Sequence, residues 1–210
     1  DLAIVGLFAD TMQMIVAHPS LAVATMAQLI AKAKAEPGKI AFSSAGNGSP
    51  GHICGEMIKQ TSGIDMLHVP YRGAAPATQA VLAGEVGLFC GPITQGAPQA
   101  KAGRLAALSV TGMARSALAP EVPTMAEQGI ANFVVTNWYG VFAPAKTLGP
   151  VMATLRNGFQ QAFAEPETRS RLAAAGIDTY WKDATEGAKM IEADLAKWGR
   201  VIKAGNIKAD

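Results

Sequence analysis

Short apolar runs alternate with amphipathic segments along the first half of the chain. The runs LAIVGLF (2–8) and MQMIVAH (12–18) predict two strands close together in the sequence. Further strands are predicted at 39–44, 66–70, 85–90 and 104–110, and a helical pattern separates each from the next. This alternation predicts an α/β fold, with a mainly parallel sheet and helices on both of its faces.

The pattern changes after residue 110. Residues 111–131 are rich in loop-forming residues, a strand is predicted at 134–142, and the rest is mostly helical with one short strand at 177–181. The closing helices carry apolar stripes with helical spacing, which predict buried faces: Val151, Leu155, Phe159 and Phe163, then Ala188, Ile191, Leu195, Trp198 and Ile202. These stripes are larger than two strands could cover, which indicates a second lobe that lacks part of its own sheet.

Composition narrows the function classes. The 210 residues include 18 Lys and Arg against 16 Asp and Glu, a net charge of +2, which gives no reason to expect nucleic acid or a membrane surface as partner. The most apolar stretch, residues 2–24, is interrupted by Asp10, Gln13 and His18, so no run is long enough to span a bilayer. The first residue is Asp1, so either a targeting segment has been removed or the chain is a fragment.

The two cysteines, Cys54 and Cys90, lack the clustering of a zinc site and cannot build a disulfide framework. Two buried thiols are a simpler interpretation than a single bridge. We expect no metal site and no cofactor.

The segment SSAGNGSPGH (43–52) lies between a predicted strand and a predicted helix. Its glycines and short polar residues free backbone N–H groups at a helix N-terminus, which suits an anionic group. The candidate anion-binding residues here are Ser44, Gly46, Asn47, Gly48 and Ser49. An ordinary strand-to-helix turn is the alternative, because glycine and serine are common in such turns.

Gly46, Gly48 and Gly51 also match G-x-G-x-x-G, the dinucleotide-binding pattern. Two details weigh against a dinucleotide. Pro50 stiffens the turn, and Asp65 precedes the next strand, whereas a ribose-binding acid should follow it. An NADP-dependent enzyme using Arg72 is therefore kept only as a minor alternative.

A second strand-to-helix junction, VPYRGAAPA (69–77), is predicted at the same carboxyl edge of the sheet, where ligands of open α/β sheets gather. Its candidate ligand-binding residues are Tyr71, Arg72, Gly73 and Ala74. Arg72 is equally well explained as a surface charge. Catalytic patterns are poor, because His18, His52 and His68 lack metal-ligand spacing and no clear general base is present. We expect a binding protein rather than an enzyme.

Four separated segments resemble one known family. FSSAGNGSPGH with HVPYRGAAPA, then SVTGMARSALAPEVPTMAEQG, then NWYGVFAPAKT with its closing helices, are similar to the Bug family of TctC-like receptors. These are extracytoplasmic solute receptors of tripartite tricarboxylate transporters. The resemblance covers essentially the whole chain in the right order.

The resemblance implies a type II periplasmic binding fold whose two lobes close on a small carboxylate. Residues 10–130 would form the complete α/β lobe, and residues 1–9 and 131–210 a partial first lobe without the family's N-terminal segment. It also implies a periplasmic location and the membrane permease subunits of the transporter as partners. Within the site, Ser44, Gly46, Asn47, Gly48 and Ser49 would donate to the ligand carboxylate, with Gly73 and Ala74 beside them.

One departure from the family concerns the ligand. After the strand EVGLF the family often has an acidic residue and an Asn, but this chain reads Cys90-Gly91-Pro92, which favours a ligand without an amine. A further alternative to the receptor is a truncated relative that has lost ligand binding and completes its broken lobe as a homodimer.

Overall fold

The structure, a computed structural model, describes residues 1–208, which fall into two units. Unit 1 contains residues 1–11 and 137–199, and unit 2 contains residues 12–136 and 200–208. The chain passes between the units three times, within strand β1 (Leu2–Ala17), at the start of strand β6 (Thr136–Pro144) and near the end of helix α7 (Ala184–Ala204).

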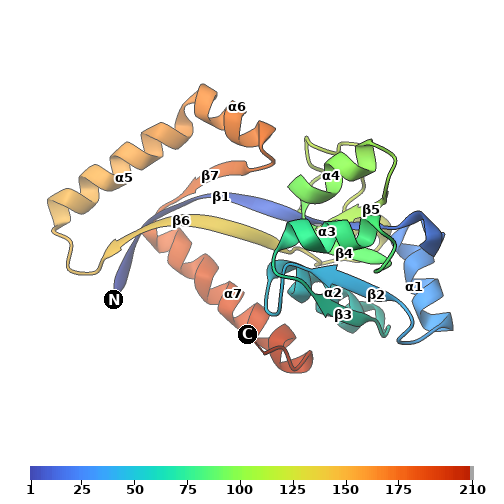
Figure 1. The fold of residues 1–210 in the computed structure, drawn as a ribbon. Helices are drawn as coiled ribbons and strands as arrows, with labels where there is room; N and C mark the ends of the chain where they lie inside the picture. Colours follow the sequence, from blue (N-terminus) through green and yellow to red (C-terminus); the bar gives the residue numbers. More distant parts are fainter. Residues whose placement is uncertain (209–210) are drawn as a thin grey trace. The chain divides into compact units, whose positions relative to one another are not determined.

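The elements of Figure 1 follow one another in regular alternation through unit 2. After β1 come η1 (Pro19–Leu21), α1 (Met26–Ala35), β2 (Ala41–Ser44), α2 (Pro50–Ser62), β3 (Leu67–Pro70), α3 (Ala74–Leu82), β4 (Leu88–Pro92), α4 (Ile93–Lys101), β5 (Ala106–Val110) and η2 (Ala126–Gln128). Following β6 are α5 (Gly149–Ala164), α6 (Pro166–Ala174), β7 (Asp178–Lys182) and α7.

The prediction of two strands at 2–8 and 12–18 is wrong, because the structure has one continuous strand, β1. The linking residues Ala9, Asp10 and Thr11 include no glycine or proline, and the one turn-forming residue, Asp10, is held in the strand by its pairing with Asp178 of β7. The same strand therefore serves the sheets of both units.

The sheet of unit 2 has the strand order β3-β2-β4-β1-β5. Strand β2 pairs in parallel with β3 and β4, whereas β1 pairs antiparallel with both β4 and β5. The predicted parallel sheet is thus correct for the strands of the β/α alternation, and β1 is an antiparallel strand inserted among them. The carboxyl ends of β2, β3 and β4 consequently lie along one edge of the sheet.

Helices cover both faces of this sheet. One face carries α3 and α4, which bury Met14, Phe89 and Ile93 among a larger apolar cluster. Cys90 faces the other way because side chains alternate along a strand, and there the Cys54 thiol of α2 is hydrogen-bonded to it. Helix α2 approaches the sheet so closely that a side chain at Gly51 would clash with the carbonyl oxygen of Cys90.

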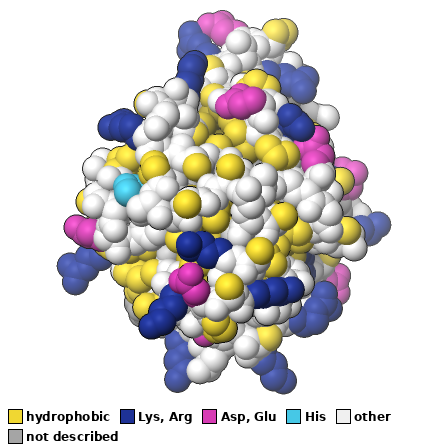
Figure 2. Space-filling view, turned by 90° about the vertical axis from the view of Figure 1, so that its right-hand side faces the viewer, with side chains coloured by type: hydrophobic (Ala, Val, Ile, Leu, Met, Phe, Trp, Pro, Cys, Tyr) yellow, Lys and Arg dark blue, Asp and Glu magenta, His cyan; other side chains and the backbone are white. Residues whose placement is uncertain are grey.

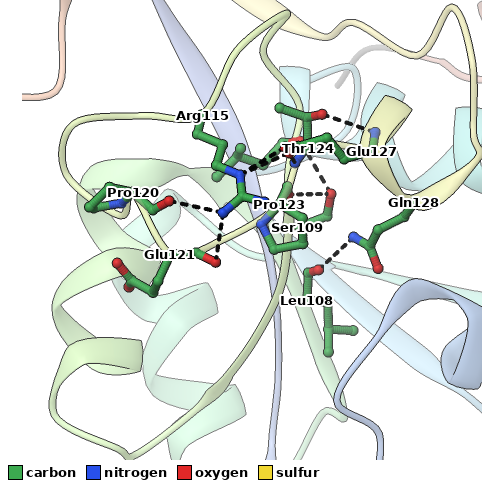
Figure 3. Close-up of polar contacts among 10 residues, drawn as sticks. Leu108, Ser109, Arg115, Pro120, Glu121, Pro123, Thr124, Glu127 and Gln128 are labelled. Carbon is green, nitrogen blue, oxygen red and sulfur yellow. Dashed lines mark hydrogen bonds and ion pairs between the residues drawn. The ribbon is translucent and has the colours of Figure 1, made fainter.

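Residues 111–131, which the sequence pattern shows only as a loop, are held by a clamp of polar contacts (Figure 3). The Nε of Arg115 donates to both carboxylate oxygens of Glu127 at 3.0 Å, and its Nη1 donates to the carbonyl oxygen of Pro120 at 3.2 Å. Glu127 also accepts from the Thr124 backbone N–H at 2.7 Å, while the Thr124 hydroxyl accepts from the Glu127 N–H. This reciprocal pair is a capping box.

In unit 1, the first part of β1 pairs with β7 and β6. Aromatic contacts fill the layer against the helices. The ring of Phe8 stacks on that of Phe163 with centroids 4.0 Å apart, and the Trp138 indole donates to Asp194 of α7 at 3.2 Å. A small apolar cluster is centred on Val5 and Met152.

The closing helices expose part of their apolar stripes. The predicted burial is wrong for Leu195, which is 70% exposed, and for Val151, which is 48% exposed. It is also wrong for Ala188 and Ile202, which are exposed. The sheet of unit 1 consists of part of β1 with β6 and β7, and these strands leave part of each stripe uncovered.

The fit of α2 against β4 can be tested with two glycine substitutions. Gly51→Ala should destabilise unit 2 by about 2 kcal/mol, because the new methyl group meets backbone atoms of β4 that cannot move aside. Gly158→Ala in α5 is the matched control, since a Cβ there meets nothing within 4 Å and should stabilise the protein by about 0.5 kcal/mol. Urea unfolding followed by circular dichroism measures both. A Gly51→Ala variant as stable as the wild type would contradict the close approach.

Candidate functional site

The two predicted site segments meet at the carboxyl edge of the sheet in unit 2. Ser44 and Pro70, the last residues of β2 and β3, are paired in register. Beyond them, the Tyr71 N–H donates to the carbonyl oxygen of Ser44 at 3.1 Å, and Gly46 lies beside the carbonyl oxygen of Tyr71. The loop 45–49 and the loop 71–73 therefore form one continuous surface in front of α2 and α3.

The glycines of these loops are needed for their backbone conformation. Gly46 has φ of 129°, Gly48 has φ of 72° and Gly73 has φ of 117°, values that residues with a Cβ rarely adopt. A Cβ at Gly48 would meet nothing within 4 Å, so the loop is open in front of this residue. A ligand could approach the backbone here.

Ser49 is the N-cap of α2. Its hydroxyl oxygen accepts from the His52 backbone N–H at 3.3 Å, as expected for a serine preceding Pro50 at the first helical position. The same hydroxyl donates to Ser44 Oγ at 3.3 Å. An O–H···O bond of this length is weak, so Ser49 can exchange it for a stronger acceptor.

Two histidines that sequence reasoning set aside lie directly behind the loop 45–49. The Gly48 N–H donates to Nδ1 of His52 at 3.1 Å, and Nε2 of His68 is hydrogen-bonded to Ser44 Oγ at 2.6 Å. The two imidazoles stack with centroids 3.6 Å apart and planes 13° apart. Their positions, one on α2 and one on β3, gave no spacing signal along the chain.

Burial lowers the pKa of both imidazoles. The pKa of His68 falls to about 4, first because of burial and then because of His52 and Lys59. The pKa of His52 is also lowered, mainly by burial, although Glu56 acts in the opposite direction. Both rings are therefore neutral at pH 7, which fits the acceptor role of His52 Nδ1 toward Gly48.

The second segment offers a helix N-terminus and a cation. Gly73 is the N-cap residue of α3 and has no capping side chain, and Ala74 begins that helix. Arg72 is exposed, and no salt bridge is found for it among the described residues. Tyr71 is partly buried and packs against the apolar cluster under α3, so its ring supports this junction.

The G-x-G-x-x-G match has a structural explanation other than a dinucleotide. Its third glycine, Gly51, permits the contact of α2 with β4. Asp65 precedes β3 and its carbonyl oxygen accepts from Gly38, at the end of the strand opposite to the loops. The antiparallel β1 between β4 and β5 also differs from the parallel sheet of dinucleotide-binding folds.

Among the described residues, no group of three or more His, Cys, Asp or Glu side chains could hold a metal ion. Within the same part of the chain, no helix is both long and apolar enough to cross a membrane. Figure 2 shows Lys and Arg side chains spread over one face with carboxylates among them. The net charge of the chain is only +2, so an anion at the loops would depend on local donors rather than on a broad field of positive charge.

Unit 1 contains a pair of carboxyl groups that sequence reasoning missed. Asp10 of β1 lies opposite Asp178 of β7 in the antiparallel register. Burial, then the charge of Asp178, raises the pKa of Asp10 to about 6, with Lys182 acting the other way. The hydroxyl of Tyr180 nearby is buried, and no hydrogen-bond partner for it is found among residues 1–208. Its pKa rises to about 12, first because of burial and then because of Asp10 and Asp194.

Comparison with known sequences gives a family. The family model described as "Tripartite tricarboxylate transporter family receptor" (TctC) matches residues 1–207. One relative, the UPF0065 protein in the tcbD-tcbE intergenic region of Pseudomonas sp. (strain P51), is 34% identical over 184 residues, which is 87% of this chain. The chain spans only 55% of that relative's length.

Solved structures with the same fold include a protein of R. palustris, Rpa4515 with adipate, which has a TM-score of 0.88 and 26% identity. The periplasmic binding protein BugD has a TM-score of 0.83 and 27% identity. All of this chain aligns with each of them, whereas 70% of the Rpa4515 chain and 71% of the BugD chain are covered.

The carboxyl pair of unit 1 predicts a pH-dependent stability effect. Because the folded-state pKa of Asp10 lies above its ordinary value of 3.8, its ionised form opposes folding at pH above about 6, and this penalty disappears as the pH falls toward 3.8. Asp10→Asn should therefore raise the melting temperature at pH 7.5 and leave it unchanged near pH 3.5.

Asp183→Asn is the control with the opposite sign. Asp183 Oδ1 accepts from the backbone N–H groups of Thr185 and Glu186 at the start of α7, and these bonds lower its pKa. Replacing the Asp183 carboxylate should therefore lower the melting temperature at pH 7.5. Differential scanning calorimetry across pH 3.5–7.5 measures both variants. Equal melting temperatures for Asp10→Asn and wild type at pH 7.5 would contradict the raised pKa of Asp10.

Proposed function

The chain belongs to the TctC family of tripartite tricarboxylate transporter receptors, and from this premise we propose that it captures a small carboxylate for such a transporter. The family and the structural neighbours are solute-binding receptors rather than enzymes. The proposal concerns this chain's own ligand and the residues that hold it.

One observation carries the proposal. The loop 45–49 and the loop 71–73 are in contact at the carboxyl edge of one sheet, and each leads directly into a helix N-terminus. Helix N-termini combine unsatisfied N–H groups with the positive end of the helix dipole, and two of them converging favour a negative charge. A carboxylate is the anion that this arrangement and the family have in common.

In the proposed mechanism, the direct donors are the Ala74 N–H at the start of α3 and the Ser49 hydroxyl. The N–H groups of Gly46, Gly48 and Gly73 donate to acceptors within the site, namely Ser44 Oγ, His52 Nδ1 and the Tyr71 carbonyl oxygen, and these bonds fix the shape of the two loops. Ser49 turns its hydroxyl from Ser44, 3.3 Å away, to the carboxylate, because a charge-assisted bond is stronger than the bond it replaces. Ser44 keeps its short contact with His68 and positions the loop. Arg72 adds an exposed cation beside the two loops, and Asn47 is a further proposed donor to the carboxylate.

We propose a carboxylate without an amine as the ligand. Cys90 and Gly91 of β4 offer no charged or amide group near the edge, and Cys90 is fully buried against Cys54. Adipate, which the similar R. palustris protein was solved with, is a dicarboxylate of this type and a suitable first probe.

The location and partners of the whole protein follow from the family and stay predictions. We propose that it acts in the periplasm and delivers its ligand to the membrane permease subunits of the transporter. The homodimer alternative also stays a prediction, and light scattering of the 210-residue chain tests it.

Isothermal titration calorimetry at pH 7.5 tests the proposed ligand class. We expect heat of binding with adipate and none with adipamide, which has the same length but no charge. Equal binding of the two compounds would overturn the proposal that a carboxylate is recognised. Absence of binding by a series of mono-, di- and tricarboxylates would overturn the proposed function itself.

The role of Ser49 is tested by substitution. Ser49→Ala should weaken adipate binding by about 1 kcal/mol or more through loss of one charge-assisted hydrogen bond. Ser62→Ala, at the other end of α2, is the control and should bind like the wild type. Since Ser49 also caps α2, circular dichroism must show both variants folded at the temperature of the titration. An unchanged affinity in Ser49→Ala would remove this residue from the site.

A further inference from the structure

The His52–His68 pair carries an inference that rests on the proposed function and deepens it. The two imidazoles form the support behind the loop 45–49, His52 from the first turn of α2 and His68 from β3. They stack at 3.6 Å, and the ring of Phe42 lies against His68 with centroids 4.9 Å apart. His52 is only 7% exposed.

Each imidazole is bonded to a different part of the loop. His52 Nδ1 accepts from the Gly48 N–H at 3.1 Å, so this nitrogen must be unprotonated. Nε2 of His68 contacts Ser44 Oγ at 2.6 Å, and Ser44 Oγ in turn accepts from the Gly46 N–H and from the Ser49 hydroxyl. The backbone conformation of the loop is thus tied to both rings, and the bond from Gly48 requires His52 Nδ1 to be unprotonated.

The surroundings favour neutral rings. The charged groups that act on the pair are Glu56 and Lys59 of α2, which form a salt bridge with each other at 2.8 Å. Lys59 disfavours protonation of both rings, whereas Glu56 favours it for His52. Two stacked imidazolium ions would also repel each other at 3.6 Å.

We propose that His52 and His68 are positioning residues that hold the loop 45–49 in its carboxylate-binding conformation, and that they do so only while the imidazole of His52 is neutral. Protonation of His52 must occur at Nδ1, where the proton replaces the hydrogen bond from Gly48. The Gly48 N–H then loses its acceptor, and the loop is released from α2. Acid pH therefore weakens carboxylate capture through the protein, separately from protonation of the ligand.

The first test needs no ligand and no variant. Proton–nitrogen NMR of the wild-type chain between pH 7.5 and 4 follows the Gly48 amide and the imidazole nitrogens together. We expect the Gly48 amide to shift and lose protection from hydrogen exchange with the same midpoint as His52, below the ordinary histidine pKa of about 6.5. A Gly48 amide that does not follow either imidazole would overturn the inference.

The second test separates positioning from simple structural support. His52→Asn keeps an acceptor at the position of Nδ1, and His68→Gln keeps a polar group at the position of Nε2, but neither residue titrates. The double variant should bind adipate within about threefold of wild type at pH 7.5 and about fivefold more tightly than wild type at pH 4. Because both proteins are measured with the same ligand at each pH, protonation of adipate cancels in the ratio.

His18→Asn provides the control, because His18 bonds to Ser20 and lies away from the loops. It should keep the wild-type pH profile. A double variant with the wild-type profile would overturn the inference. Should the double variant misfold, the single variants and the titration of the Gly48 amide test the inference instead. Failure of the proposed function would show differently, as no heat with carboxylates at pH 7.5 while the Gly48 amide still follows His52.

Discussion

At Gly51, helix α2 rests on the backbone of β4, and the absence of a side chain makes this contact with Cys90 possible. Farther along α2, the absence of a side chain at Gly55 leaves room for the ring of Phe42. Because the helix lies this close to the sheet, its first turn is just behind the end of β2, which brings Ser49 to Ser44 and His52 to His68. The geometry of the loop between them depends on this one close approach.

Much of the fold could be predicted from the sequence, because it depends on local periodicity. The β/α alternation predicted the strands β2 to β5 to within a few residues, and it predicted a helix between each of these strands and the next. What local pattern could not show was pairing. Whether residues 2–17 form one strand or two, and whether Leu195 is covered, depends on which distant segments lie against them.

In the site, too, local sequence patterns could be predicted and long-range contacts could not. Glycine and serine at strand-to-helix junctions indicated the two loops, and the structure brings these loops together, while their binding of a ligand stays a proposal. The stacked histidines were missed because His52 and His68 belong to separate elements and meet only when β2 and β3 pair. Thr124 and Glu127, by contrast, had the spacing of a capping box that could have been found in the loop 111–131.

Strand β1 has a consequence for how the protein folds. In unit 2 it lies between β4 and β5, yet it precedes both in the chain, with Ile15 paired to Cys90 and Ser109. The sheet cannot close until β4 and β5 are available, and long-range pairing of this kind makes folding slow. Until then the apolar residues of β1 have no partner strands, so the nascent or unfolded chain should be a good substrate for chaperones and should remain unfolded for longer than a helical protein of its size.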